Sequence, residues 1–175
     1  MPHAPSKFWT SKRAAAASEF ALVLPIILFM FAAIVEFGRI FQVYVATNRL
    51  ATQFAIAWAD CATACQTELN EYSSSYTIAN IAPQLTTTSP PLTLTMFEVT
   101  MSGTTPTVVY SYPASATMTA AQTTVAQANF SSGQTGVIVT ASYAHTLDFF
   151  NSLMAPILGP YLNPTYTVAQ LKNYT

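Results

Sequence analysis

One carboxylate of this chain stands at the entrance to an apolar segment. Glu19 directly precedes an uncharged apolar run, Phe20 to Val35, which ends at Glu36. A carboxylate at the mouth of a membrane segment costs on the order of a few kcal/mol unless a cation compensates it. A cut after Ala14 would make Glu19 the fifth residue of the new chain. The ammonium group created there is the partner we expect for Glu19 of a neighbouring copy.

The alternative interpretation of Glu19 is local. Helix amino termini favour carboxylates, because the unpaired N–H groups of the first turn carry partial positive charge. Glu19 would then stabilise the start of a helix and would need no second copy.

Three further residues are candidates for a role in assembly. Glu36 and Arg39 are three apart, so they can form an ion pair on one helix face, with a bridge between copies as the alternative. Pro25 removes a backbone hydrogen bond and is expected to kink or loosen the helix, or to be a proline that a membrane helix tolerates.

The two cysteines, Cys61 and Cys65, are four residues apart and would share one face of a helix. An oxidising exterior would favour a disulfide between them, which is the first interpretation. Two free thiols are the second. A metal site is the weakest, because the spacing is not that of a redox or zinc motif and no second pair accompanies it.

Catalytic chemistry finds little support. Ser142, His145 and Asp148 fall within one short segment, and three residue types close in sequence do not supply the convergent geometry of a triad. His3 has no co-ligands near it, and no phosphate-binding or dinucleotide-binding fingerprint occurs. We therefore expect a protein that is not an enzyme, with no cofactor and no metal.

The charge pattern bears on localisation. Only 7% of the residues are charged and the net charge is -1, which gives no electrostatic footprint for nucleic acid. Lys7, Lys12 and Arg13 precede the apolar run, so the positive-inside bias places the amino terminus in the cytoplasm and the bulk of the chain outside. A cleaved signal peptide is the alternative, although no A-x-A-like site closes the run.

Three regions follow from these patterns. Residues 1–14 are a basic leader, residues 15–60 a long hydrophobic helix, and residues 61–175 an exported domain. In the second half of the helix, Tyr44, Leu50, Phe54 and Trp58 recur at helical spacing, and Phe37 and Phe41 are interpreted as core contacts with them. Gln42, Thr47, Asn48, Arg49 and Gln53 are placed on the other side.

Alternation and β-branched residues predict strands in the exported domain. We expect strands at 92–101, 107–112, 137–144 and 165–171, and short helices at 76–85, 116–128 and 149–158. The predicted fold class is α+β: a long amino-terminal helix packed on a small antiparallel sheet of three to four strands.

Two separated blocks of the sequence carry a resemblance to a known family. The first is the Ala-rich stretch that leads into Glu19-Phe-Ala-Leu and Pro25, and the second is Glu36-Phe-Gly-Arg39. Together they resemble the TadE-like family of tight-adherence (Tad) pilus proteins. The resemblance covers residues 12–60 well and the remainder loosely.

That resemblance implies a type IV pilin-like protein of the bacterial inner membrane, with its carboxy-terminal domain in the periplasm or on an extracellular pilus. The implied partners are copies of itself, other pilin-like subunits, the Tad machinery and a prepilin peptidase that would cut between Ala14 and Ala15. Ala14 stands where a prepilin usually has Gly. An uncut, membrane-anchored assembly factor is therefore the alternative to a filament subunit that mediates adhesion, and an anchored periplasmic enzyme or binding domain is the second alternative.

Overall fold

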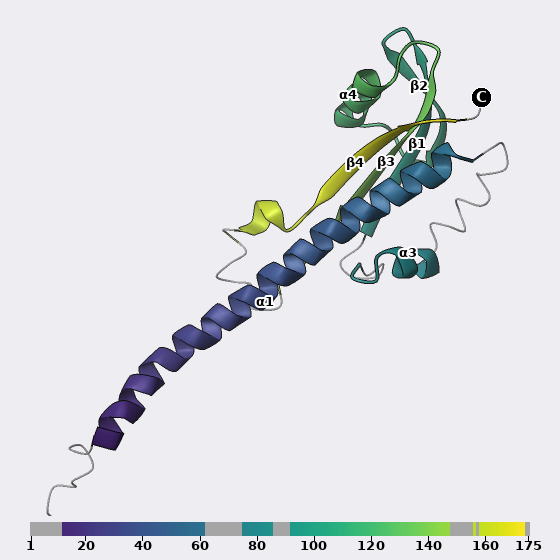
Figure 1. Cartoon of the computed structure of the whole chain (residues 1–175). Coiled ribbons are helices and arrows are strands. Elements are labelled where there is room, and N and C mark those ends of the chain that lie inside the picture. Colours follow the sequence, from purple (N-terminus) through teal and green to yellow (C-terminus); the bar gives the residue numbers. More distant parts are fainter. Residues whose placement is uncertain (1–11, 62–74, 86–91, 148–155, 157, 174–175) are drawn as a thin grey trace, which may run out of the picture. The chain divides into compact units, whose positions relative to one another are not determined.

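The computed structural model describes residues 12–61, 75–85, 92–147, 156 and 158–173 (Figure 1). It divides into two compact units, residues 1–39 and 40–175. The helix α1, Lys12–Ala59, contributes to both units. The predicted long helix is confirmed, and it begins at Lys12 rather than at Ala15. Its helical assignment continues through Pro25.

A four-stranded sheet organises the unit formed by residues 40–175 (Figure 1). Its strands are β1 (Leu92–Ser102), β2 (Thr105–Tyr112), β3 (Thr135–Tyr143) and β4 (Thr165–Leu171), in the spatial order β2-β1-β3-β4. Every neighbouring pair is antiparallel. The predicted α+β class and antiparallel sheet are therefore confirmed, and the last strand has the predicted bounds.

The β1–β2 hairpin turns within two residues, because Ser102 is paired with Thr105. Gly103 occupies this turn with a φ of 63°, a conformation that glycine adopts without the steric cost of a Cβ. The second predicted strand consequently begins at Thr105, two residues earlier than its sequence pattern suggested.

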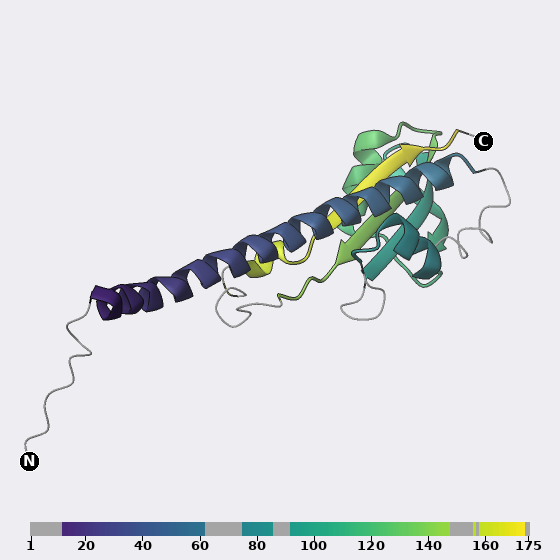
Figure 2. The ribbon, with the colours of Figure 1, turned by 60° about the horizontal axis from the view of Figure 1, so that its bottom comes forward.

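The second half of α1 covers one face of the sheet (Figure 2). Its buried residues recur at the three- and four-residue steps of a helix that presents one stripe to a core. They are Val43, Ala46, Thr47, Leu50, Ala51, Phe54, Ala55, Trp58 and Ala59. The short helix α3, Ser75–Ile81, adds Ile78 to the same core. On the sheet side the core contains alternate residues of two strands: Leu94, Met96, Val137, Val139, Ala141 and Tyr143.

The helix α4, Ala120–Asn129, covers part of the opposite face. Ala126 and Phe130 pack there against Phe97, Val99 and Ile138. The ring of Phe130 lies so close to Gly136 that a Cβ at this position would be 2.3 Å from it, so the contact requires glycine. The sequence predicted this helix from residue 116 and did not assign it a face of the sheet.

The start of α4 is fixed by a capping box. Gln122 N donates to Thr119 Oγ1 at 3.3 Å, and Thr119 N donates to Gln122 Oε1 at 2.8 Å. Such reciprocal bonds satisfy N–H groups that a helix start leaves without partners. The helix therefore begins at Ala120, although the Ala-rich pattern extends back to residue 116.

The end of β4 is fastened to the end of α1. Asn173 N donates to Ala59 O at 3.1 Å, and the Asn173 side-chain amide donates to Asp60 Oδ1. One residue earlier, Lys172 Nζ lies 2.7 Å from Glu98 Oε1, with both side chains largely buried. These contacts give a hydrogen-bond donor to the Ala59 carbonyl at the carboxyl end of α1 and a cation to the Glu98 carboxylate.

The loop before β4 also contacts α1. Tyr44 Oη donates to Tyr161 O at 2.8 Å, where Tyr161 ends the short 3-10 helix η2, Gly159–Tyr161. The rings of Tyr44 and Tyr166 meet edge to face at 6.3 Å. Most of the predicted helix at 149–158 lies outside the described residues.

Candidate functional site

Between Glu19 and Glu36, within residues 1–39, α1 is apolar on all sides. Its large hydrophobic side chains are exposed around the whole circumference: Phe20, Leu22, Val23, Leu24, Ile26, Ile27, Leu28, Phe29, Met30, Phe31, Ile34, Val35 and Phe37. A helix that is hydrophobic all round is typical of a membrane span or of a helix surrounded by other helices. By length and composition, Ala15–Ala59 includes a segment able to cross a membrane.

The side chain of Glu19 is exposed at the start of this apolar segment. Among the side chains that the structure describes, it has no hydrogen-bond or ion-pair partner. The neighbouring Ser18 Oγ donates to Ala15 O at 2.7 Å, one turn earlier. The predicted cleavage positions, Ala14 and Ala15, both lie within α1.

At the other end of the apolar run, Arg39 Nη1 lies 3.9 Å from Glu36 Oε2. The Glu36 side chain is 8% exposed and the Arg39 side chain 41%. This is the contact on one helix face that the three-residue spacing predicted. Its role in assembly, and that of Pro25 between the two carboxylates, stay predictions.

Cys61 follows directly after the end of α1 and Asp60. The structure describes Cys61 as one half of a disulfide. Cys65 lies outside the described residues, so the predicted bond between these two cysteines stays a prediction.

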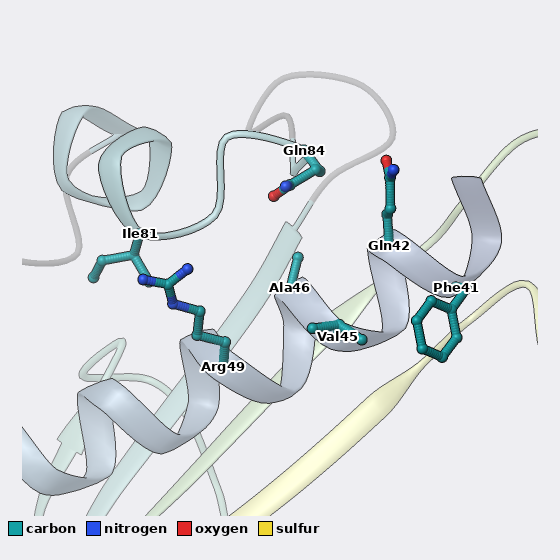
Figure 3. Close-up of a pocket in the computed structure, with 7 residues that line it drawn as sticks. All are labelled: Phe41, Gln42, Val45, Ala46, Arg49, Ile81 and Gln84. Carbon is teal, nitrogen blue, oxygen red and sulfur yellow. The ribbon is translucent and has the colours of Figure 1, made fainter. Parts of the chain in front are cut away.

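A groove lies between α1 and the α3 region within residues 40–175 (Figure 3). Its volume is about 160 Å³. We call it the α1–α3 groove, and its lining residues are Phe41, Gln42, Val45, Ala46, Arg49, Ile81 and Gln84. Figure 3 shows Arg49 extending from α1 towards Ile81. Gln42 projects from α1, and Gln84 projects from the segment that follows α3. The lining of the groove thus combines apolar side chains with two amides and one guanidinium.

The exposed side of α1 corrects two sequence interpretations. Phe41 is 69% exposed and Phe37 51%, so neither is a core contact, and Val45, one turn after Phe41, is 51% exposed. Thr47, expected on the polar side, is fully buried, and its hydroxyl donates to Val43 O at 2.7 Å. A threonine can enter a helical core in this way because its hydroxyl bonds to the preceding turn. The four-residue spacing of Phe41 and Val45, outside the buried stripe, was the signal that could have located the groove.

Ser142 and His145, which were considered for catalysis, make structural contacts between strands and loops. Ser142 Oγ lies 2.8 Å from Thr165 Oγ1 across two strands, and His145 N donates to Leu162 O at 2.9 Å. His145 is buried, and Asp148 lies outside the described residues. Within the described part of the chain, no three His, Cys, Asp or Glu side chains are placed to hold a metal ion.

An exposed apolar helix that continues into a helix-on-sheet unit fits a protein anchored in a membrane or built into a pilus. A comparison with family models gives a more specific result: residues 14–55 match the model described as TadE-like protein. The resemblance to the TadE-like family is thereby confirmed over this segment. No curated protein and no solved structure matches the chain.

Proposed function

We propose that this chain is a pilin-like structural subunit of a Tad-type surface filament. The single observation that supports the proposal most strongly is the exposure of the large apolar side chains of residues 20–37, around the whole helix. In the membrane, lipid would cover these side chains. In a filament, the same segments of neighbouring copies would cover them, and burial from water would supply most of the assembly energy.

Glu19 would set the register of this bundle. In an apolar bundle an uncompensated carboxylate is costly, so each copy would be held where its Glu19 meets a cation of a neighbour. The expected cation is the ammonium group at Ala15 after cleavage by a prepilin peptidase. The sheet unit would face outward and carry adhesion, as its sparse charge and its exposed hydroxyl groups permit.

The test is to replace Glu19 with Gln, which removes the charge and keeps the shape, and to count filaments per cell. We expect severe loss of filaments with unchanged amounts of membrane-inserted protein. The matched control is Ser18→Ala, one residue away, which should leave filaments unchanged. Normal filaments with Glu19→Gln would remove the register role.

A second candidate is a membrane-anchored assembly factor of the same machine, which is supported by Ala14 in the position where a prepilin usually has Gly. Such a protein would keep its leader and stay out of the fibre. Mass spectrometry of the mature amino terminus, together with blotting of sheared fibres, separates the two. An uncut chain that is missing from the fibres would favour the assembly factor.

A further inference from the structure

Most charged side chains that the structure describes have a partner within the same copy. Glu36 is paired with Arg39, Glu98 with Lys172, and Asp60 accepts a hydrogen bond from Asn173. Among the described side chains, this leaves Glu19 and Arg49, which are both exposed. The remaining pair consists of one anion and one cation, and so the two are complementary in charge.

The surroundings of Arg49 suit a carboxylate on an apolar helix. Phe41 and Val45 offer exposed apolar surface in the α1–α3 groove, and Gln42 and Gln84 add amide donors at its sides. A guanidinium group presents several N–H donors in a planar fork that matches the two oxygens of a carboxylate.

The surroundings of Glu19 show the matching chemistry. Phe20 is 61% exposed, Leu22 75% and Val23 48%, so the single carboxylate is flanked by apolar side chains. We define the Glu19 turn as residues 19–23. It combines one anion with apolar contacts, as the α1–α3 groove combines one cation with apolar contacts.

We propose that the α1–α3 groove of one copy binds the Glu19 turn of a second copy, with Arg49 paired to the carboxylate of Glu19. The inference rests on the proposed function, because it names the partner and the contact that assembly would use. A single anchored copy cannot form this pair, since Glu19 precedes and Arg49 follows the apolar run that would cross the membrane. A second copy displaced along the bundle can bring the two residues together.

This pair is compatible with an ammonium partner for Glu19 and does not depend on it. A carboxylate has two oxygens with about four acceptor positions, so it can accept from an ammonium group and from a guanidinium group at once. If the leader remains uncut, no ammonium group arises at Ala15, and Arg49 becomes the cation that compensates Glu19 in the assembly.

A charge exchange tests the pair. Filaments are counted in cells that express Arg49→Glu, Glu19→Arg, or both changes in one chain. Each single change should reduce filaments at least about tenfold, because like charges would face each other. The double change should give more filaments than either single change, because opposite charges then face each other again. Asn48→Glu is the matched control: it introduces the same charge one residue away, outside the groove lining, and should leave filaments unchanged. A lipid phosphate as the true partner of Arg49 would predict that the exchange restores nothing.

A cross-linking measurement keeps the proposal testable if Arg at position 19 impairs insertion. Two tagged copies with native charges, one Ser18→Cys and the other Gln42→Cys, are expressed together, and sheared filaments are oxidised. A mixed disulfide dimer is expected, and it should be lost when Ile56→Cys replaces Gln42→Cys.

The outcomes separate the inference from the proposed function. Normal filaments with Arg49→Glu, or oxidised filaments without the mixed dimer, would overturn the inference and leave the filament role intact. If the chain is missing from sheared fibres of wild-type cells, the proposed function itself fails.

Discussion

The first part of α1, Phe20 to Val35, and its second part, Val43 to Ala59, are both rich in apolar residues but differ in which side chains are buried. From Phe20 to Val35 the large side chains are exposed on every side of the helix. From Val43 to Ala59 the buried residues form a single stripe, and residues such as Asn48 and Arg49 lie on the remaining, exposed side. Hydrophobicity alone does not distinguish these parts; the periodicity of the polar residues does.

The difference shows where each part obtains its stability. The stripe of the second part is covered by the sheet and by α3 within the same copy. The side chains of the first part need a cover that the described chain does not supply, which is lipid or further helices. One continuous helix can thus belong to a folded unit at one end and to a bilayer or an assembly at the other.

The largest expected effect comes from the same substitution made in both parts. Leu50 is fully buried and Leu28 is 58% exposed. Leu50→Ala should lower the free energy of unfolding by about 2–5 kcal/mol, because it removes buried methyl groups and leaves a cavity. Leu28→Ala should change it by less than about 0.5 kcal/mol.

Urea denaturation of the full chain in detergent, followed by Trp58 fluorescence in a Trp9→Phe background, measures both values. Equal losses for the two variants would contradict the distinction between the parts of α1.

A charged substitution should be costly in the first part of α1 and tolerated on the exposed side of the second part. Leu28→Asp places a carboxylate within the apolar run and should cost about 2.5–3.5 kcal/mol of membrane insertion. Asn48→Asp, on the exposed side of the second part, should cost nothing measurable. The fraction of protein that remains in membranes after an alkaline carbonate wash measures insertion. Retention of Leu28→Asp at the wild-type level would argue against a membrane span.

A smaller effect is expected where the second part of α1 ends. Lys172→Met leaves Glu98 largely buried without its cation and should lower the free energy of unfolding by about 1.5–3 kcal/mol. Lys172→Arg keeps the charge and serves as the control. Adding Glu98→Gln to Lys172→Met should recover part of the loss, because the buried charge is then removed. Failure to recover any of it would assign the loss to packing of the lysine stem.

Local pattern made much of this fold predictable. The apolar run and its helical continuation specified α1, and alternation specified four strands, with Thr165–Leu171 at the predicted bounds. Helix and strand boundaries were less accurate where capping or turn chemistry decided them, as at Thr119 and Gly103. Thr119 acts through two reciprocal hydrogen bonds with Gln122 and Gly103 through one dihedral angle, and neither leaves a trace in hydrophobic periodicity.

The contacts between distant residues could not be derived from the sequence. Glu98 and Lys172 are 74 positions apart, and their pairing follows from the strand order, which the pattern does not specify. The α1–α3 groove likewise depends on where α3 docks. Glu19 was recognisable at once because a carboxylate beside an apolar run conflicts with its surroundings, whereas Arg49 looked like an ordinary exposed cation until the partners of the other charges were known.

The fastening of Asn173 to the end of α1 has a consequence for biogenesis. Asp60 and Asn173 are separated by 113 positions, so the ribosome produces α1 long before the strand that closes the domain over it. If the domain is exported, as the proposed function requires, the apolar stripe from Val43 to Ala59 crosses the membrane before its sheet has been made. A chain in the course of such export would expose this apolar stripe, and a periplasmic chaperone that binds apolar helices would recognise it at this stage.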